Sequence, residues 1–242
     1  MLKVYSTEYD ASKYCADTLQ CAIEKNPHLT ICLAAGHTSL AFFDILIERG
    51  RQKKIDFSNV CVVGLDEWVG LSGKDDGSCE NFLRENIFNH INVNENNIRL
   101  FDGKAANLEH ECRQIDQFIK GNGGIDYLLL GMGMNGHLAL NEPGVDESKT
   151  SHVAVLDSVT KTVADKYFKE TPDITEGITL GIKNIVAAKK IQLLITGERK
   201  REIVSKLIME EQTNMLPGSL LKKVKHAEFV LDSEASSLLN IK

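Results

Sequence analysis

The chain has 242 residues, of which 43% are hydrophobic and 26% are charged, and its formal net charge at pH 7 is -6. This composition excludes disordered, collagen-like and fibrous proteins, and the length is sufficient for the core of one α/β domain. The excess of acidic residues argues against nucleic acid or an acidic membrane surface as a partner, because both would repel the chain.

Apolar residues at helical spacing alternate with short, continuous apolar runs along the whole chain. The helical spacing predicts amphipathic helices, and the continuous runs predict buried strands. In chain order, we predict a helix over 7–25, a strand over 29–34, a helix over 39–50, a strand over 60–65, helices over 79–90 and 107–120, a strand over 125–130, a helix over 158–169, a strand over 191–196, a helix over 199–210 and a strand over 227–231.

Strands that are apolar throughout are typical of a parallel sheet covered on both faces, and the intervening helices supply the crossovers that such a sheet needs. We therefore predict an α/β fold with a Rossmann-like, doubly wound, mostly parallel sheet and helices on both faces. No linker interrupts the pattern, so we expect residues 1–242 to form a single domain, in which the least regular stretch, 143–182, could form a lid. Ligands of such sheets bind at the carboxyl ends of the strands, where the strand order reverses.

The six cysteines form no CxxC pair and show no zinc-type spacing, so we interpret them as reduced thiols. The amino-terminal residues lack a secretion signal, and no apolar run is long enough to span a membrane. We therefore expect a cytoplasmic protein with no membrane partner.

The first predicted loop of interest follows the strand over 29–34 and contains Gly36, His37, Thr38 and Ser39. A glycine, two hydroxyl groups and unpaired backbone amides before a helix can form a cradle for a small anion. Alternatively, Gly36 makes a tight turn and Ser39 caps the helix.

A second predicted loop follows the strand over 60–65 and begins with Asp66 and Glu67. A carboxylate at the tip of a strand is well placed to take a proton from a ligand, and partial burial would raise its pKa toward the useful range. The alternative is a structural carboxylate whose partners are backbone amides.

The third loop, 131–143, follows the strand over 125–130 and has the sequence GMGMNGHLALNEP. Its glycines allow close approach of the backbone to a ligand, and His137 offers an imidazole, a side chain that can both take up and release a proton. Glu142 can orient this ring. No third ligand accompanies the two residues at metal spacing, so we expect no metal site.

Four segments, LDEWVGL at 65–71, GMGMNGHLALNEPG at 131–144, ITLGIK at 178–183 and TGERK at 196–200, together resemble the hexosamine-6-phosphate isomerase/deaminase family. They occur in the family's order and spacing. The motifs DEWVGL, SCENF and MNGHLALNEPG are most similar to those of galactosamine-6-phosphate isomerases, and the motifs of glucosamine-6-phosphate deaminases are very close to them.

This resemblance implies a small-molecule partner, an amino-sugar phosphate, and a reaction without a cofactor. The sugar ring opens, the aldose becomes a ketose, and ammonia leaves. We expect galactosamine 6-phosphate to give tagatose 6-phosphate; the alternative is glucosamine 6-phosphate, which would give fructose 6-phosphate.

The resemblance also assigns catalytic roles by position. Asp66 matches the base that takes the proton from C2 and returns it to C1, whereas its neighbour Glu67 matches no assigned role. His137 matches the group that moves a proton at the ring oxygen O5, and Glu142 matches the carboxylate that holds His137. Asn135 stands where many members of the family carry aspartate, so we expect it to orient His137 without adding charge.

The phosphate-binding residues follow in the same way. The loop Gly36, His37, Thr38 and Ser39 matches the family's phosphate loop, and Lys200 matches a lysine that neutralises the phosphate. Lys166 aligns loosely with a phosphate-binding arginine, and Gly136 belongs to the substrate-binding glycine loop. These are listed with the catalytic group as the candidate site: Asp66, Asn135, His137, Glu142, Gly36, His37, Thr38, Ser39, Gly136, Lys166 and Lys200.

Some members of the family are hexamers that an acetylated sugar phosphate activates through basic residues after the NEP motif. Here the corresponding stretch reads HVAV at 152–155, so we expect hyperbolic kinetics without an activator. The sequence leaves open whether the chain forms a homo-oligomer, since without the allosteric segment a monomer or a dimer fits as well as a hexamer.

Three other classes of protein fit the sequence less well. In 6-phosphogluconolactonases the motif after the histidine continues toward threonine, alanine and serine, whereas here it reads LALNEP. A sugar-phosphate sensor would carry a helix-turn-helix module, for which the chain leaves no room before its first helix. A nucleotide-dependent dehydrogenase would carry GxGxxG after the strand over 29–34.

Overall fold

The computed structural model describes residues 1–164 and 174–239. Seven strands form one sheet in the order β1-β10-β9-β6-β2-β3-β5, and every neighbouring pair is parallel. The strands are β1 (Leu2–Tyr5), β2 (Thr30–Leu33), β3 (Cys61–Val63), β5 (Ile98–Arg99), β6 (Tyr127–Leu130), β9 (Ile191–Ile195) and β10 (Ala227–Asp232). The predicted doubly wound parallel sheet is confirmed.

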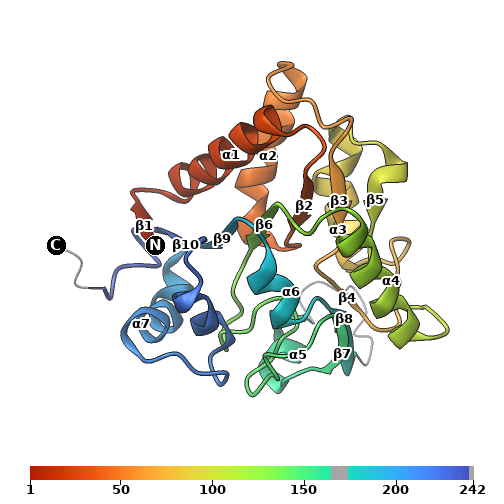
Figure 1. The fold of residues 1–242 in the computed structure, drawn as a ribbon. Coiled ribbons are helices and arrows are strands. Elements are labelled where there is room, and N and C mark those ends of the chain that lie inside the picture. Colours follow the sequence, from red (N-terminus) through yellow and green to blue (C-terminus); the bar gives the residue numbers. More distant parts are fainter. Residues whose placement is uncertain (165–173, 240–242) are drawn as a thin grey trace.

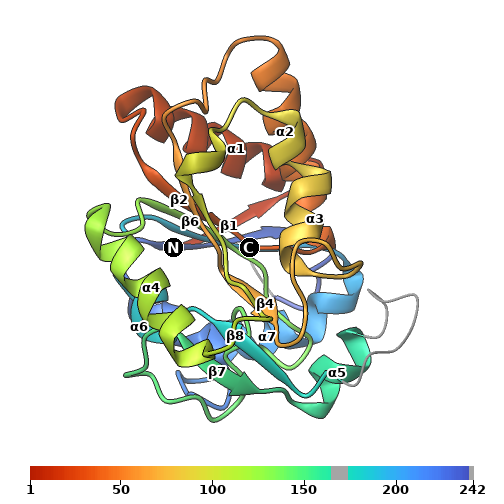
Figure 2. The same ribbon diagram turned by 90° about the vertical axis from the view of Figure 1, so that its right-hand side faces the viewer.

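Helices cover both faces of this sheet (Figure 2). On one face α1 (Glu8–Lys25), α2 (Leu40–Arg51) and α3 (Cys79–Asn86) lie together, and on the other face lie α4 (Leu108–Gly121), α6 (Ile182–Ala187) and α7 (Arg201–Met209). The two cores are built from alternate residues of the same strands: Leu129 packs on the side of α1 and α2, whereas Leu128 and Leu130 pack on the opposite side.

Three further strands form a small antiparallel sheet in the order β4-β8-β7, with β4 (Asp66–Trp68) paired to β8 (Glu176–Thr179) and β8 paired to β7 (His152–Val155). The sequence analysis placed residues 66–68 in a loop and treated 143–182 as irregular, so both expectations are wrong at these strands. The strands are three or four residues long, and β7 is only partly buried, which leaves too few positions for a periodic pattern.

The described helices and strands otherwise begin and end close to the predicted residues. The helix predicted over 79–90 ends at Asn86 and continues as a 3-10 turn over Phe88–His90, and the one predicted over 158–169 is described as α5 (Ser158–Ala164). The remaining residues of that prediction, 165–169, lie outside the described part of the chain. The strands β1 and β5 and the helix α6 were not predicted, because each is short. Further 3-10 turns lie at His37–Ser39, Glu95–Asn97, Glu198–Lys200 and Pro217–Lys223.

The strand order reverses between β2 and β6 (Figure 1). On one side of β2, the chain adds β3 and then β5 outward. It then returns with β6 to the other side of β2 and adds β9 and β10 outward, beyond which the first strand, β1, forms the edge. Leu33 of β2 is in register with Leu129 of β6, so both strands end at the same edge of the sheet. The loops that follow them therefore meet there.

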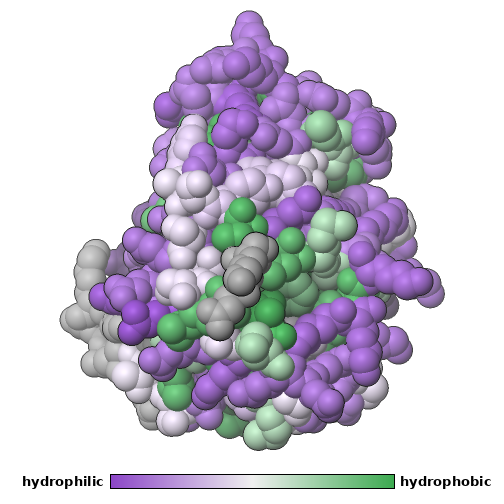
Figure 3. All heavy atoms as spheres, turned by 90° about the vertical axis from the view of Figure 1, so that its left-hand side faces the viewer, coloured by the Kyte–Doolittle hydropathy of each residue, from purple (hydrophilic) through white to green (hydrophobic). Residues whose placement is uncertain are grey.

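At the end of the sheet away from β5, β1 pairs only with β10 and forms an edge. Exposed apolar side chains lie in this strand (Val4), just before it (Met1) and in the carboxyl-terminal region (Leu238). Figure 3 shows a hydrophobic area on the face of the molecule that carries this edge. Within residues 1–164 and 174–239, no helix is long and apolar enough to cross a membrane.

The turn after β5 packs directly against the end of β4, and this contact predicts a stability effect. The amide of Gly70 donates a hydrogen bond to the carbonyl oxygen of Gly103 (2.8 Å), and a Cβ on Gly103 would clash with the carbonyl oxygens of Trp68 and Leu71. We expect Gly103→Ala to lower the free energy of unfolding by about 1–3 kcal/mol, because backbone atoms cannot give way as a flexible side chain can.

Urea denaturation measures this loss, with Gly121→Ala as the matched control. A Cβ at Gly121 would meet no atom within 4 Å, and Gly121 ends α4, where alanine is favoured over glycine. Equal midpoints for the two variants would show that the turn adapts freely and does not hold β4 in place.

Candidate active site

A pocket of about 1060 Å³ opens at the edge where β2 and β6 end. Loops that follow β2, β3, β6 and β9 line it, together with parts of α3 and α5. The structure thus brings together most of the predicted site: Gly36, His37, Thr38, Ser39, Asp66, His137 and Lys200 all line this pocket. Glu142, Asn135 and Gly136 are not among its lining residues, and Lys166 lies outside the described residues.

The predicted anion loop is a 3-10 turn over His37–Ser39 that leads into α2. Gly36 has φ +150° and ψ 161°, a conformation that residues with a side chain rarely adopt. The hydroxyl of Ser39 is buried and donates to the carbonyl oxygen of Ala34 (2.9 Å), and it makes no capping bond to α2. The alternative that Ser39 caps the helix is therefore wrong, and its hydroxyl helps instead to fix the shape of the turn.

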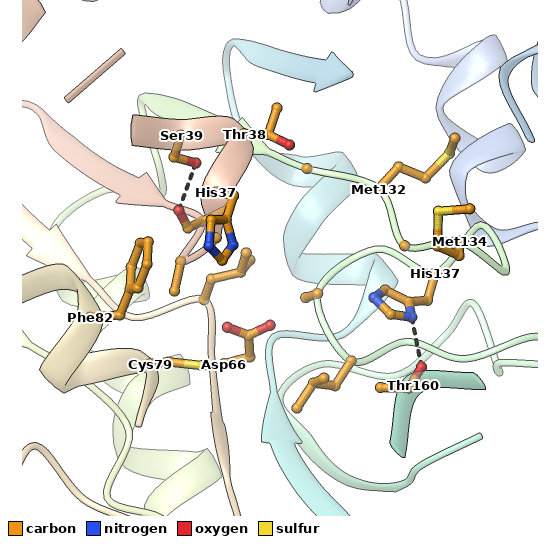
Figure 4. A pocket seen from close by; sticks show the side chains of 18 of the residues that line it. His37, Thr38, Ser39, Asp66, Cys79, Phe82, Met132, Met134, His137 and Thr160 are labelled. Atoms are coloured by element: carbon orange, nitrogen blue, oxygen red, sulfur yellow. Dashed lines mark hydrogen bonds between the residues drawn. The ribbon is translucent and has the colours of Figure 1, made fainter. Parts of the chain in front are cut away.

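Asp66 is the first residue of β4, and its carboxylate points into the pocket (Figure 4). Burial raises its pKa to about 7, and the neighbouring charge of Glu67 adds to this rise, whereas a hydrogen bond with the thiol of Cys79 opposes it. At neutral pH such a group is ionised in a large fraction of the molecules and can still take up a proton readily, which is the property of a general base.

Glu67 points the other way and is 1% exposed. Its carboxylate accepts hydrogen bonds from the backbone amides of Trp68 (2.8 Å), Cys79 (3.0 Å) and Glu80 (3.0 Å) and from the hydroxyl of Ser78 (2.7 Å). Two of these amides belong to the first turn of α3, where a negative charge is favoured. The structural alternative in the sequence analysis, a carboxylate held by backbone amides, thus applies to Glu67 and not to Asp66.

On another wall of the pocket, His137 belongs to a small polar cluster. Its Nδ1 lies 3.0 Å from the hydroxyl of Thr160 in α5 and 3.5 Å from Oε2 of Glu142. The side-chain amide of Asn135 donates to Oε2 of Glu142 (2.8 Å), and its carbonyl oxygen accepts from the backbone amide of His137 (3.2 Å). Asn135 therefore connects Glu142 and His137, as an orienting residue would.

Burial would raise the pKa of Glu142, but its neighbours outweigh this effect. Hydrogen bonding to His137 and the charge of that ring, followed by hydrogen bonds from Thr160 and Asn135, hold the pKa of Glu142 below its ordinary value. Glu142 is consequently ionised at neutral pH and remains fixed behind the imidazole.

Lys200 reaches the pocket from the turn after β9, and its ammonium group donates to the carbonyl oxygen of Met132. Burial lowers the pKa of Lys200 to about 8. The turn is held by Asp232, which is 3% exposed and accepts hydrogen bonds from the amide of Gly197 on both carboxylate oxygens (3.0 and 3.1 Å). A partly desolvated ammonium beside a polar turn is suited to binding an anion.

Sequence reasoning missed three residues that shape the site: Thr160, Cys79 and Asp232. Thr160 and Cys79 line the pocket, and Asp232 holds the turn that carries Lys200. Asp232 stands at the end of an apolar strand, just as Asp66 follows one. This position could have marked it as a site residue in the sequence. Cys79 lies in the segment SCENF, which the resemblance singled out without giving Cys79 a role, and the segment around Thr160 has no local sign of a site. In the described part of the chain, no group of three or more His, Cys, Asp and Glu side chains is placed to hold a metal ion.

Comparison with known proteins places this geometry in a family. The family model for glucosamine-6-phosphate isomerases/6-phosphogluconolactonase matches residues 6–230. A glucosamine-6-phosphate deaminase of Clostridium perfringens (strain 13 / Type A) is 36% identical over 231 residues, which cover 95% of this chain and 96% of that protein.

The solved structures agree with this match. A protein described as a monomeric glucosamine-6-phosphate deaminase of the NagB superfamily superposes with a TM-score of 0.94 at 32% identity, covering 98% of this chain and 99% of the other. A 6-phosphogluconolactonase from Trypanosoma cruzi shares the fold, with a TM-score of 0.79 at 19% identity over 99% of this chain and 97% of the other. The fold is thus that of the NagB superfamily, and the chain belongs to the family of glucosamine-6-phosphate isomerases and 6-phosphogluconolactonases.

The adjacent carboxylates Asp66 and Glu67 predict a measurable pKa. We expect Asp66 to titrate near pH 7 and to move to lower pH in Glu67→Gln, because that substitution removes a neighbouring negative charge. The pKa should remain above the ordinary value of 3.8, since Asp66 stays buried. Carbon-13 NMR of labelled aspartate carboxyl groups measures both values.

Glu80→Gln is the control, because it removes a negative charge from the turn of α3 that binds Glu67, and this charge is not among those that raise the pKa of Asp66. Glu67→Gln should also lower the free energy of unfolding by about 1–3 kcal/mol, as an amide nitrogen cannot accept the bonds that Glu67 accepts. An unchanged titration of Asp66 in folded Glu67→Gln would contradict the electrostatic coupling.

Proposed function

We propose that the protein is a glucosamine-6-phosphate deaminase, which converts glucosamine 6-phosphate and water into fructose 6-phosphate and ammonia. The observation that carries this proposal is the placement of Asp66 and His137 on different walls of one pocket (Figure 4), with the 3-10 turn His37–Ser39 and Lys200 lining the same space. The pocket thus offers a base for the C2 proton in Asp66, an acid/base group for the ring oxygen in His137, and polar and charged groups for the phosphate in the turn and Lys200.

Binding begins with the phosphate in this proposal. The turn over His37–Ser39 and the ammonium group of Lys200 hold it, and the sugar then extends between Asp66 and His137. His137 moves a proton from the C1 hydroxyl to the ring oxygen O5. The bond between C1 and O5 breaks, and a carbonyl group forms at C1.

Asp66 then acts on the open chain. It takes the proton from C2, which is acidic because the negative charge that develops there spreads into the adjacent carbonyl group. The same proton returns to C1, and a proton from the ammonium group at C2 passes to the oxygen on C1. The product has a hydroxymethyl group at C1 and a protonated imine at C2. Water adds to C2, and ammonia leaves.

A further part of the proposal is the choice between glucosamine 6-phosphate and galactosamine 6-phosphate as the substrate. The wording of the motifs favoured galactosamine 6-phosphate, whereas the relative from Clostridium perfringens and the monomeric solved structure are both glucosamine-6-phosphate deaminases. These relatives support the alternative of the sequence analysis better than its first choice. The two sugars differ only in the orientation of the C4 hydroxyl group, so the difference between them rests on very few hydrogen bonds.

We also infer that the protein works in the cytoplasm. All six cysteines are free thiols in the structure, which supports a reducing compartment. The sequence leaves the oligomeric state open, and the solved relative at 32% identity is described as monomeric.

The direct test measures release of ammonia and ketose phosphate from glucosamine 6-phosphate and from galactosamine 6-phosphate, without metal or nucleotide. We expect glucosamine 6-phosphate to react faster. Asp66→Asn should reduce the rate at least about 10²-fold, because an amide cannot take up the C2 proton. Asp44→Asn, at an exposed position of α2, is the control and should keep the activity.

Faster release from galactosamine 6-phosphate would overturn the choice of sugar and leave the chemistry in place. If the protein hydrolysed 6-phosphogluconolactone and released ammonia from neither amino sugar, the role of Asp66 as the base that takes the C2 proton would be wrong.

A second prediction concerns the phosphate. Because burial lowers the pKa of Lys200 to about 8, its positive charge is present below that pH and is lost as the pH rises through it. We therefore expect KM to rise above about pH 8. Lys200→Met should raise KM at pH 7 by about 10-fold to 100-fold, the effect of losing one charged hydrogen bond, and should flatten its dependence on pH.

Steady-state kinetics between about pH 6.5 and 9.5 provide this measurement, with Lys206→Met, an exposed position of α7, as the control. A Lys200→Met enzyme whose KM at pH 7 equals that of the wild type would exclude Lys200 from the phosphate site.

A further inference from the structure

We propose that Thr160 is a positioning residue for the ring-opening step, which holds His137 with its proton on Nδ1 and its Nε2 free to act on the sugar. The role in ring opening rests on the proposed function, whereas the position of the proton does not.

The geometry places the Thr160 hydroxyl beside both partners of the pair formed by His137 and Glu142. The hydroxyl oxygen lies 3.0 Å from Nδ1 of His137, closer than Oε2 of Glu142, which lies at 3.5 Å. Thr160 is 3% exposed and sits in the first turn of α5, where the amide of Val159 donates to the carboxylate of Asp157 (2.8 Å). The Thr160 side chain is therefore enclosed at the start of this helix.

The direction of each hydrogen bond follows from the donors that are present. Glu142 is ionised, since its neighbours lower its pKa, so it can only accept hydrogen bonds. Oε2 of Glu142 lies 3.5 Å from Nδ1 of His137, and an acceptor with a negative charge at this nitrogen favours a proton on it. The Thr160 hydroxyl oxygen then accepts that proton in the 3.0 Å contact with Nδ1.

A second contact fixes the plane of the ring. A Cβ on Gly133 would clash with three atoms of the His137 ring, so the ring lies directly against the backbone of Gly133. With that face blocked and Nδ1 committed to Thr160, the Nε2 edge is the one left for the pocket (Figure 4). An unprotonated Nε2 can take the proton of the C1 hydroxyl and pass it to O5.

The local sequence gives no sign of this role, because Thr160 lies 23 residues from His137 and its threonine neighbours are ordinary helix residues. Thr162, two residues further along, donates to the carbonyl oxygen of Ser158 (3.0 Å) and is exposed. It is a matched control for any substitution at Thr160.

The first test reads the tautomer without any reaction. Nitrogen-15 NMR of labelled imidazoles at about pH 9, where ordinary histidines are neutral, distinguishes a proton on Nδ1 from one on Nε2. His137→Gln assigns the signal among the seven histidines. We expect Nδ1–H in the wild type, in Thr160→Ser and in Thr162→Val, and a shift toward Nε2–H in Thr160→Val. A proton on Nε2 in the wild type, or an unchanged signal in Thr160→Val, would overturn the proposal.

The second test connects the tautomer to catalysis. We expect Thr160→Val to lower kcat about 10-fold to 100-fold while KM stays within about 3-fold, and Thr160→Ser to restore kcat, because serine keeps the hydroxyl and valine keeps the shape. With glucosamine 6-phosphate deuterated at C2, the isotope effect in Thr160→Val should not exceed that of the wild type, since ring opening and not proton removal has become slower.

The outcomes separate the two proposals. A larger isotope effect in Thr160→Val would mean that the substitution disturbs Asp66, which overturns the role in ring opening. A wild type that releases no ammonia from either amino sugar would refute the proposed function, and the NMR result would still decide whether Thr160 sets the tautomer.

Discussion

The buried carboxylate of Glu67 is the interaction on which the arrangement of the site depends. A buried negative charge is very costly unless donors surround it, and here the donors come from two segments, the end of β4 and the start of α3. Glu67 therefore requires these segments to meet. Because side chains alternate along a strand, fixing Glu67 in the interior directs Asp66 to the opposite side, into the pocket. The same charge then adds to the rise in the pKa of Asp66.

The sequence revealed the central sheet because its strands β2, β6 and β9 are buried along their whole length and carry continuous apolar runs. It also indicated the site, because polar motifs follow three of the strands and parallel strands end at one edge. The small sheet carried no such signal. Its pairing of Asp66 with Thr179 joins segments far apart in the chain, and the half-exposed β7 lacks a periodic pattern. The contact of Thr160 with His137 likewise exists only once β7 and α5 have been placed.

Fold alone does not decide between the two reactions named in this family. The lactonase from Trypanosoma cruzi shares the sheet at 19% identity, and its likeness extends over almost the whole chain. The difference has to lie in the groups that face the pocket. Hydrolysis of a lactone needs an activated water, whereas removal of a proton from carbon needs a base next to C2. The burial of Asp66 beside a like charge produces such a base, and this is the physical ground for preferring the deaminase reaction.

The surroundings push the pKa values of two acidic groups of the site, Asp66 in the pocket and Glu142 behind His137, in opposite directions. Asp66 is raised to about 7 by burial and by Glu67, whereas the hydrogen bonds of His137, Thr160 and Asn135 keep Glu142 below its ordinary value. In the proposed reaction Glu142 therefore remains a fixed charge, and Asp66 is the carboxylate that exchanges protons. Lys200 sets the other limit, since its charge is lost above about pH 8 in the free enzyme. A bound phosphate extends that limit upward, because an adjacent negative charge favours the ammonium form. Binding of the substrate thus widens the narrow pH range in which the base is ionised and the phosphate site is charged at the same time.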